Sequence, residues 1–89
     1  MQRRTCYFTG RVQGVGFRYT VKNIAMQYDV GGYVRNLPDG RVELVMEGDE
    51  NQMENLVHDV QDRMNGYIRN VAAQEAPATG EFSYFAIRH

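Results

Sequence analysis

The chain has 89 residues, of which 43% are hydrophobic and 24% are charged, and its formal net charge is −1. This length and composition are those of one globular domain over residues 1–89, and they exclude two independent cores. The balanced charge argues against a general nucleic-acid-binding protein. No apolar run reaches the length of a membrane span or of a signal-peptide core.

The charges are divided unevenly along the chain. Up to Arg41 there are seven basic and two acidic residues, and from Val42 onward there are three basic and nine acidic residues. An anion site is therefore expected in the first half, although ordinary surface charge can give the same distribution. Cys6 is the only cysteine. It allows no disulfide within the chain, which suits the reducing cytoplasm, where we expect this protein to reside.

The N-terminal third predicts a strand, a loop and a helix. β-Branched and aromatic residues favour a strand over Arg3–Val12, and the glycines of Gln13–Gly16 indicate a loop. Apolar residues then recur at near-helical spacing from Phe17 to Tyr28. We expect Asp29–Gly32 to end this helix, because glycine supplies the positive φ that helix ends often need.

A hairpin and a second helix follow. The Pro-Asp-Gly run in Leu37–Gly40 is a strong turn signal that joins two short strands, Tyr33–Asn36 and Arg41–Glu47. Asp49 is the expected N-cap of the second helix, and Asn65 with the following glycine is expected to end it. The apolar stripe of this helix consists of Met53, Leu56, Val57, Val60 and Met64.

The last part of the chain predicts a strand in Tyr67–Glu75, a turn in Ala76–Gly80 and a closing strand over Glu81–Arg88. The resulting order is β-α-β-β-α-β. This order indicates an α+β, ferredoxin-like sandwich in which two helices cover one face of an antiparallel sheet. We expect the two histidines, His58 and His89, to have surface or packing roles.

Two segments contain residues of the types that bind ligands or take part in catalysis. In Gly10–Arg18 a strand leads through a glycine-containing loop into a helix, where converging N–H groups and the helix dipole form a cradle for an oxyanion. Arg18 would lie in the first helical turn and reach the phosphate oxygens. A tight turn beside a surface arginine explains the same pattern. The Gly-Lys-Ser/Thr ending of the nucleotide P-loop is absent.

The second segment, Gly32–Glu43, contains Asn36 at the entry of the turn. Asparagine before a Pro-Asp-Gly turn is common for purely structural reasons. Taken together, however, the strings GRVQGVGFR and GYVRNLPDGRVE closely resemble the two signature motifs of the acylphosphatase family. They occur in the family's order and in its structural places, and the closing segment Gly80–Arg88 resembles the family's last strand. The resemblance covers nearly the whole chain.

The resemblance implies an acylphosphatase, a hydrolase that splits carboxyl phosphates without a metal or cofactor and acts as a monomer on a small-molecule substrate. By the resemblance, Arg18 binds the phosphate and Asn36 orients the attacking water. The phosphate-binding loop consists of Gln13, Gly14, Val15, Gly16, Phe17 and Arg18. An amide cannot act as a base at neutral pH, and a carboxylate leaves without an acid to protonate it, because its conjugate acid has a pKa of about 4.

One stretch departs from the family. Asn65–Val71 replaces the usual Gly-Pro-containing turn and longer variable strand, so the path of the fourth strand around Tyr67–Glu75 is not predicted. One alternative function is a non-hydrolytic or carbamoyl-phosphate-handling binding module, the role that this fold has as the first domain of larger maturation proteins. Because the sequence ends at His89 without an appended domain, we expect the free-standing hydrolase. RNA recognition, which uses the same element order, requires aromatic residues that Arg41–Glu47 lacks.

Overall fold

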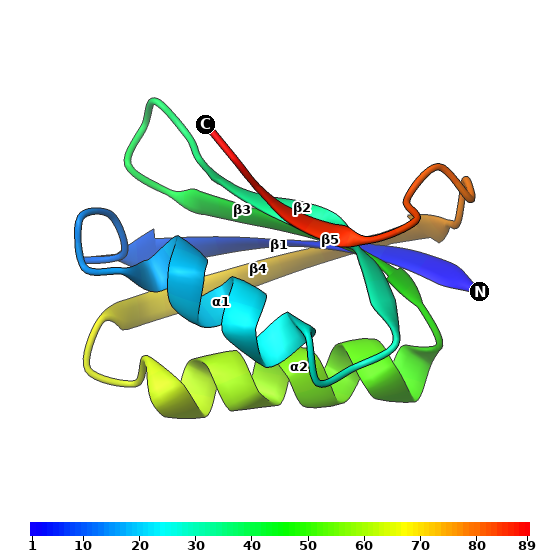
Figure 1. Ribbon diagram of the computed structural model, residues 1–89. Coiled ribbons are helices and arrows are strands. Elements are labelled where there is room, and N and C mark those ends of the chain that lie inside the picture. The colour runs from blue at the N-terminus through cyan, green and yellow to red at the C-terminus, as the bar shows by residue number, and fades with distance from the viewer.

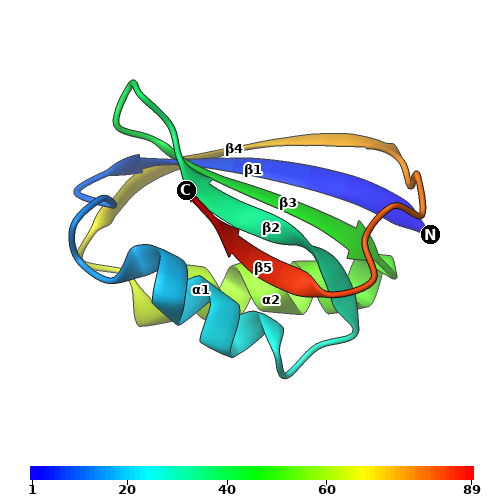
Figure 2. The ribbon, with the colours of Figure 1, turned by 45° about the horizontal axis from the view of Figure 1, so that its top comes forward.

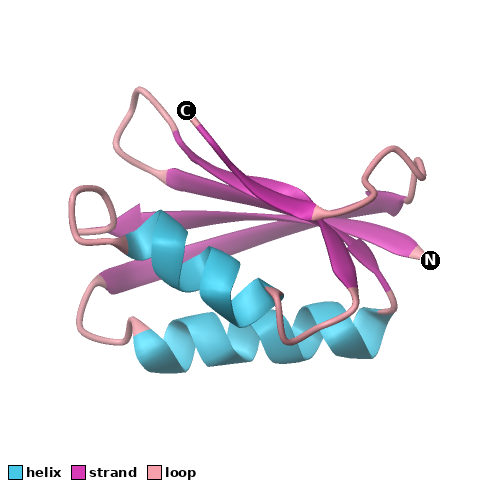
Figure 3. Ribbon diagram, viewed as in Figure 1, coloured by secondary structure: helices cyan, strands magenta, loops and turns pink.

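Alternating apolar residues in the strands and apolar stripes on the helices build a layer of two helices against one face of a sheet (Figures 1 and 3). The computed structural model describes all residues, 1–89. Neither helix is long and apolar enough to cross a membrane. The elements in chain order are β1 (Gln2–Gly10), α1 (Phe17–Ala25), β2 (Val30–Asn36), β3 (Val42–Gly48), α2 (Glu50–Arg63), β4 (Ile68–Pro77) and β5 (Phe85–Arg88).

The sheet contains five strands in the order β4-β1-β3-β2-β5 (Figure 2). The pairs β1–β4, β1–β3 and β2–β3 are antiparallel, as expected for a ferredoxin-like fold. β5, however, runs parallel to β2. The expected ferredoxin-like arrangement, with two helices on one face of the sheet, is therefore confirmed, but the sheet is mixed and not antiparallel throughout. After β4 the chain crosses to the opposite edge of the sheet, and its last residues add a fifth strand there.

The core lies between the sheet and the helices. Phe8 of β1 and Leu44 of β3 are fully buried on the helix-facing side of the sheet, and Leu56 of α2 is fully buried against it. The predicted stripe of α2 contributes Met53, Leu56, Val60 and Met64 to the core cluster, and Val57 packs against it. The periodicity of this helix was therefore interpreted correctly. Asp49 is its N-cap by position, but the Asp49 side chain makes no capping hydrogen bond.

The prediction that Asp29–Gly32 ends the first helix was wrong. α1 already ends at Ala25, and Val30 begins β2. A Cβ atom on Gly32 would lie 1.9 Å from the carbonyl oxygen of Val45, and the φ of Gly32 is +143°. Glycine is thus required here because two strands approach closely, and not because a helix needs a left-handed end.

Two strand boundaries also differ from the prediction. β1 stops at Gly10 instead of Val12, because the pairing register with β4 shifts between Thr9 and Gly10. The closing strand begins at Phe85 instead of Glu81, and the preceding residues form a loop. Pairing with β2 starts only where the N–H of Gly32 donates to the carbonyl oxygen of Tyr84 at 3.1 Å.

β3 is the central strand, and all seven of its residues are buried. Its second face carries two buried carboxylates, Glu43 and Glu47, whose exposed fractions are 7% and 6%. Glu43 accepts hydrogen bonds from Arg35 Nε at 2.6 Å and from the hydroxyl of Tyr33 at 3.2 Å. A buried carboxylate requires such partners, since otherwise it would be expelled or protonated.

Glu47 anchors the loop that leads to β5. Its carboxylate accepts hydrogen bonds from Arg3 Nε at 2.8 Å and from the backbone N–H groups of Thr79 and Gly80 at 2.8 and 2.9 Å. Burial alone would raise the pKa of the Glu47 carboxyl. The hydrogen bonds from Thr79, Arg3 and Gly80 outweigh this effect and lower the pKa from 4.5 to about 2.

A carboxyl whose pKa is lowered on folding stabilises the protein above its unfolded pKa, and this stabilisation is lost as the pH falls through the folded pKa. We therefore expect the free energy of unfolding to fall between pH 4.5 and about pH 2. The loss assigned to Glu47 should be on the order of 3 kcal/mol. Denaturant titrations of the wild type and of Glu47→Gln across this range measure the effect.

Asp62→Asn is a suitable control, because Asp62 is exposed on α2 and makes no ion pair. At neutral pH, Glu47→Gln should have a lower free energy of unfolding than Asp62→Asn. Its free energy of unfolding should also fall less steeply as the pH is lowered. An equally steep fall in both variants would contradict the assignment of this loss to Glu47.

Candidate functional site

The predicted site residues gather at one end of the sheet. The loop between β1 and α1, the turn between β2 and β3, and the C-terminus all lie at this end (Figure 1). The turn in Leu37–Gly40 was predicted correctly: the N–H of Leu37 donates to the carbonyl oxygen of Arg41 at 2.8 Å and closes the hairpin. Two segments that are distant in sequence are thereby brought together.

The loop backbone has the conformation expected of an anion cradle. Gly14 and Gly16 both have φ of +76°, and Val15 between them has a negative φ. Alternation of this kind turns successive N–H groups toward one side. Gly16 is also the N-cap of α1. The first N–H groups of the helix have no partner within the helix, and the positive end of its dipole lies beside them.

A hollow of about 130 Å³ opens between this loop and the end of β2, more than one water molecule needs. Arg18 reaches it from the first turn of α1, and Asn36 reaches it from the last position of β2. Of the other predicted loop residues, Gly14, Gly16 and Phe17 line the hollow, whereas Gln13 and Val15 do not. The lining is completed by Val12 and Tyr19.

Val12 and Tyr19 were not predicted as site residues. Val12 is buried in the core, and Tyr19 is 64% exposed at the rim. The adjacency of Tyr19 to Arg18 was the only signal in the sequence, and adjacency alone does not tell toward which side of a helix a residue projects.

The guanidinium of Arg18 is held from one side. Its Nη1 donates to the carbonyl oxygen of Arg88 at 3.1 Å and lies 3.2 Å from Nδ1 of His89. Arg18 makes no ion pair with a carboxylate, and its Nε and Nη2 donors remain available for an oxyanion. The expectation that His89 has only a surface or packing role was therefore incomplete. His58, in contrast, is exposed, with 79% of its side chain accessible.

Asn36 has an unusual environment. Its Oδ1 atom is buried and accepts no hydrogen bond from the chain. Leaving a buried acceptor unpaired costs about 1–3 kcal/mol, so such atoms are rare and often belong to functional sites. Asn36 lines the same hollow as Arg18, so its side chain lies beside the glycine-containing loop.

Gln13 is directed toward the neighbouring turn. Its Nε2 atom donates to the carbonyl oxygen of Leu37 at 2.8 Å and to that of Arg41 at 3.0 Å. The backbone of Gln13 remains part of the loop, but its side chain connects this loop with the turn that follows Asn36.

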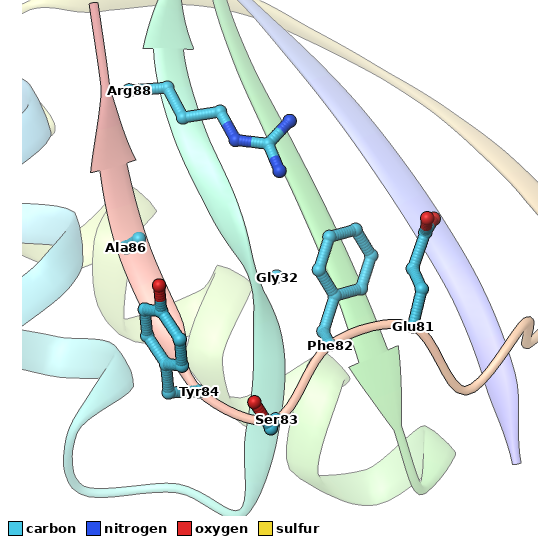
Figure 4. A pocket seen from close by; sticks show the side chains of 7 residues that line it. All are labelled: Gly32, Glu81, Phe82, Ser83, Tyr84, Ala86 and Arg88. Carbon is cyan, nitrogen blue, oxygen red and sulfur yellow. The ribbon is translucent and has the colours of Figure 1, made fainter.

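A second hollow of about 140 Å³ lies on the face of the sheet that the helices leave open (Figure 4). None of the predicted site residues lines it. Its charged side chains have structural contacts: Arg88 stacks on the ring of Tyr33 at 3.9 Å, and Glu81 pairs with Arg3. No group of three or more His, Cys, Asp or Glu side chains is placed to hold a metal ion.

Comparison with known proteins identifies the family of the chain. The family model for acylphosphatase matches residues 4–87. The acylphosphatase of Methanospirillum hungatei is 43% identical over 90 residues, which cover 99% of this chain and 98% of that protein. The crystal structure of acylphosphatase from Bacillus subtilis superposes with a TM-score of 0.90 at 34% identity and covers all of both chains. HypF of T. kodakarensis is also similar, with 32% identity and a TM-score of 0.85, but the match spans 12% of that chain.

The cradle should depend on the left-handed conformation of Gly16. Alanine at this position would meet no neighbouring atom, so its cost would come from the backbone conformation, at about 1–2 kcal/mol. We expect Gly16→Ala to lower the free energy of unfolding by about this amount and to weaken the binding of inorganic phosphate, because relaxation of the backbone turns the N–H groups away. Denaturant titration and calorimetric titration with phosphate measure the two effects.

Gly66→Ala is the matched control. Gly66 also has open space around its Cα atom, but its φ is not positive. This variant should change the free energy of unfolding by no more than about 0.5 kcal/mol, and it should leave phosphate binding unchanged. If both variants behaved alike, the conformation of Gly16 would have no special role.

Proposed function

The chain belongs to the acylphosphatase family and hydrolyses acyl phosphates to a carboxylate and inorganic phosphate, and we propose which of its residues perform the reaction. Arg18 and the backbone of the Gln13–Phe17 loop bind the phosphoryl group. Asn36 orients the attacking water. The convergence of Arg18 and Asn36 on one hollow, from segments that are distant in sequence, is the observation that carries this assignment.

Phosphate binding is supported by two kinds of donor that converge on the hollow. The first is the set of backbone N–H groups at the start of α1, which follow the left-handed Gly14 and Gly16. The second is Arg18, whose Nη1 is engaged by the end of β5. This contact leaves Nε and Nη2, which form a planar fork that suits two oxygens of one phosphoryl group.

The role of Asn36 follows from the chemistry of its side-chain amide. A water molecule that is hydrogen-bonded to this amide is fixed in position, and its lone pair is then free to attack phosphorus. An amide has no basic site at neutral pH, so Asn36 aligns this water and does not deprotonate it. The proton of the attacking water passes to an oxygen of the substrate's own phosphoryl group.

The leaving group explains why such a site is sufficient. A carboxylate departs without protonation, because its conjugate acid has a pKa of about 4. The site therefore has to place the water in line and stabilise the charge on the transferring phosphoryl group. The cation of Arg18 and the helix N-terminus supply this stabilisation.

We place this enzyme in the cytoplasm, as one domain over residues 1–89 that is catalytically complete as a monomer and needs neither a metal nor another cofactor. Cys6 is buried, and burial raises the pKa of its thiol to about 11, so the group stays protonated. A single unreactive cysteine supports a reducing compartment.

Two variants test the assignment. Arg18→Ala should abolish both turnover and phosphate binding, because it removes the charged donor. Asn36→Ala should lower kcat by roughly 100-fold or more, the usual effect of removing one aligned hydrogen-bonding group from a transition state. Asn36→Ala should bind inorganic phosphate nearly as tightly as the wild type. The measurements are hydrolysis of benzoyl phosphate in the presence of EDTA and competitive inhibition by phosphate.

Asn55→Ala is the control for Asn36→Ala, because Asn55 is an exposed asparagine on α2. It should have wild-type kinetics. Near-normal turnover of a folded Asn36→Ala would refute the water-positioning role, and loss of wild-type activity in EDTA would refute the metal-free reaction.

A further inference from the structure

We propose that Gln13 is a positioning residue that locks the turn after Asn36 against the phosphate-binding loop, so that the water and the phosphoryl group are held at a fixed separation. This inference rests on the proposed roles of Arg18 and Asn36 and assigns to Gln13 a function different from phosphate contact.

Both amide hydrogens of Gln13 are used in this connection. Nε2 donates to the carbonyl oxygens of Leu37 and Arg41, at 2.8 and 3.0 Å. These two carbonyls belong to the two ends of the hairpin turn, and the N–H of Leu37 also donates to the carbonyl oxygen of Arg41. One planar amide from the loop between β1 and α1 thus donates hydrogen bonds to both ends of the turn.

The turn has bonds of its own, but these determine its shape and not its distance from the loop. The N–H of Gly40 donates to the carbonyl oxygen of Leu37 at 3.1 Å, and Arg41 pairs with Asp39 at 2.8 Å. Arg41 also stacks on the ring of Tyr7, which belongs to β1. The hydrogen bonds of Gln13 are the side-chain hydrogen bonds that join the turn to the phosphate-binding loop.

Asn36 depends on this connection because the side-chain carbonyl group of Asn36 has no hydrogen bond to hold it. Asn36 Oδ1 accepts no hydrogen bond from the chain, so the location of the side chain follows from its backbone. That backbone directly precedes Leu37, and Asn36 pairs with Val42, the residue after Arg41. The two carbonyls held by Gln13 therefore belong to the two residues that adjoin the Asn36–Val42 pair on the turn side of the hairpin. Displacements of about 1 Å in reacting groups can cost 100-fold in rate.

Glutamine suits this position because the amide nitrogen of its side chain carries two hydrogens, one for each of the two carbonyl oxygens. Gln13 is exposed and does not line the hollow, so it contributes little to the core or to contact with phosphate. Its side chain can be removed without unfolding the protein, and this makes the proposal testable by kinetics.

The first test is Gln13→Ala in the wild-type and in the Asn36→Ala background, with benzoyl phosphate as substrate. We expect kcat to fall at least about 10-fold in the wild-type background. The inhibition constant of inorganic phosphate should stay within about threefold. In the Asn36→Ala background the same substitution should change kcat less than about twofold, because the residue that Gln13 positions is already absent. Gln61→Ala, an exposed glutamine on α2, is the matched control with wild-type kinetics.

The second test is the pH profile of Gln13→Glu. A carboxylate has no hydrogen to donate and repels the two carbonyl oxygens, whereas a protonated carboxyl regains one donor. The kcat deficit of Gln13→Glu relative to the wild type should therefore shrink as the pH falls toward about 4. A role of Gln13 that is confined to folding would show a constant deficit together with a lowered Tm.

The outcomes separate this inference from the proposed function. Wild-type kcat in a folded Gln13→Ala, or an equal loss of kcat in both backgrounds, would overturn the positioning role and leave the roles of Arg18 and Asn36 intact. Failure of the proposed function appears differently, as normal turnover of Asn36→Ala itself.

Discussion

The packing of Phe17 against Phe8 determines where the N-terminus of α1 lies relative to the sheet. Both rings are fully buried, and their centroids are 5.1 Å apart. Phe8 lies near the end of β1, and Phe17 is the first residue of α1, so their contact leaves a short loop to reverse the chain. Only a backbone with left-handed glycines such as Gly14 and Gly16 makes this reversal at low cost. The same constraint that forms the core therefore shapes the anion cradle.

The open face of the sheet supports the site from the opposite side. Glu47 is buried and can only remain charged while Arg3 and the backbone of Thr79 and Gly80 donate to it. This anchor directs the chain across to the far edge, where β5 pairs with β2. The end of β5 then presents the carbonyl oxygen of Arg88 to Arg18. A buried carboxylate far from the hollow thus contributes to the orientation of Arg18.

The sequence was sufficient for features that leave a local or periodic trace, and insufficient for those decided by distant contacts. The stripe of α2, the turn after Leu37 and the two motifs are all local patterns, and the structure unites Arg18 and Asn36 as these motifs imply. Gly32, however, has the same local signature as a helix-ending glycine, and only the carbonyl of Val45 distinguishes the two cases. The parallel β5 depends on the anchor at Glu47. The bonds of Gln13 reach 24 and 28 residues along the chain and follow no period.

The chemistry of the hollow depends on geometry more than on tuned ionisation. Of the side chains that line it, only those of Arg18 and Tyr19 can ionise. Tyr19 is largely exposed at the rim. The lining contains no carboxyl, imidazole or thiol group, and in the proposed reaction the substrate supplies both a proton acceptor and a leaving group that needs no acid. In the proposed reaction, catalysis rests on the separation between two backbone segments, the loop before α1 and the turn after β2. A fold of this size can provide such rigidity because both segments are tied to the core or to each other within a few residues of the reacting groups.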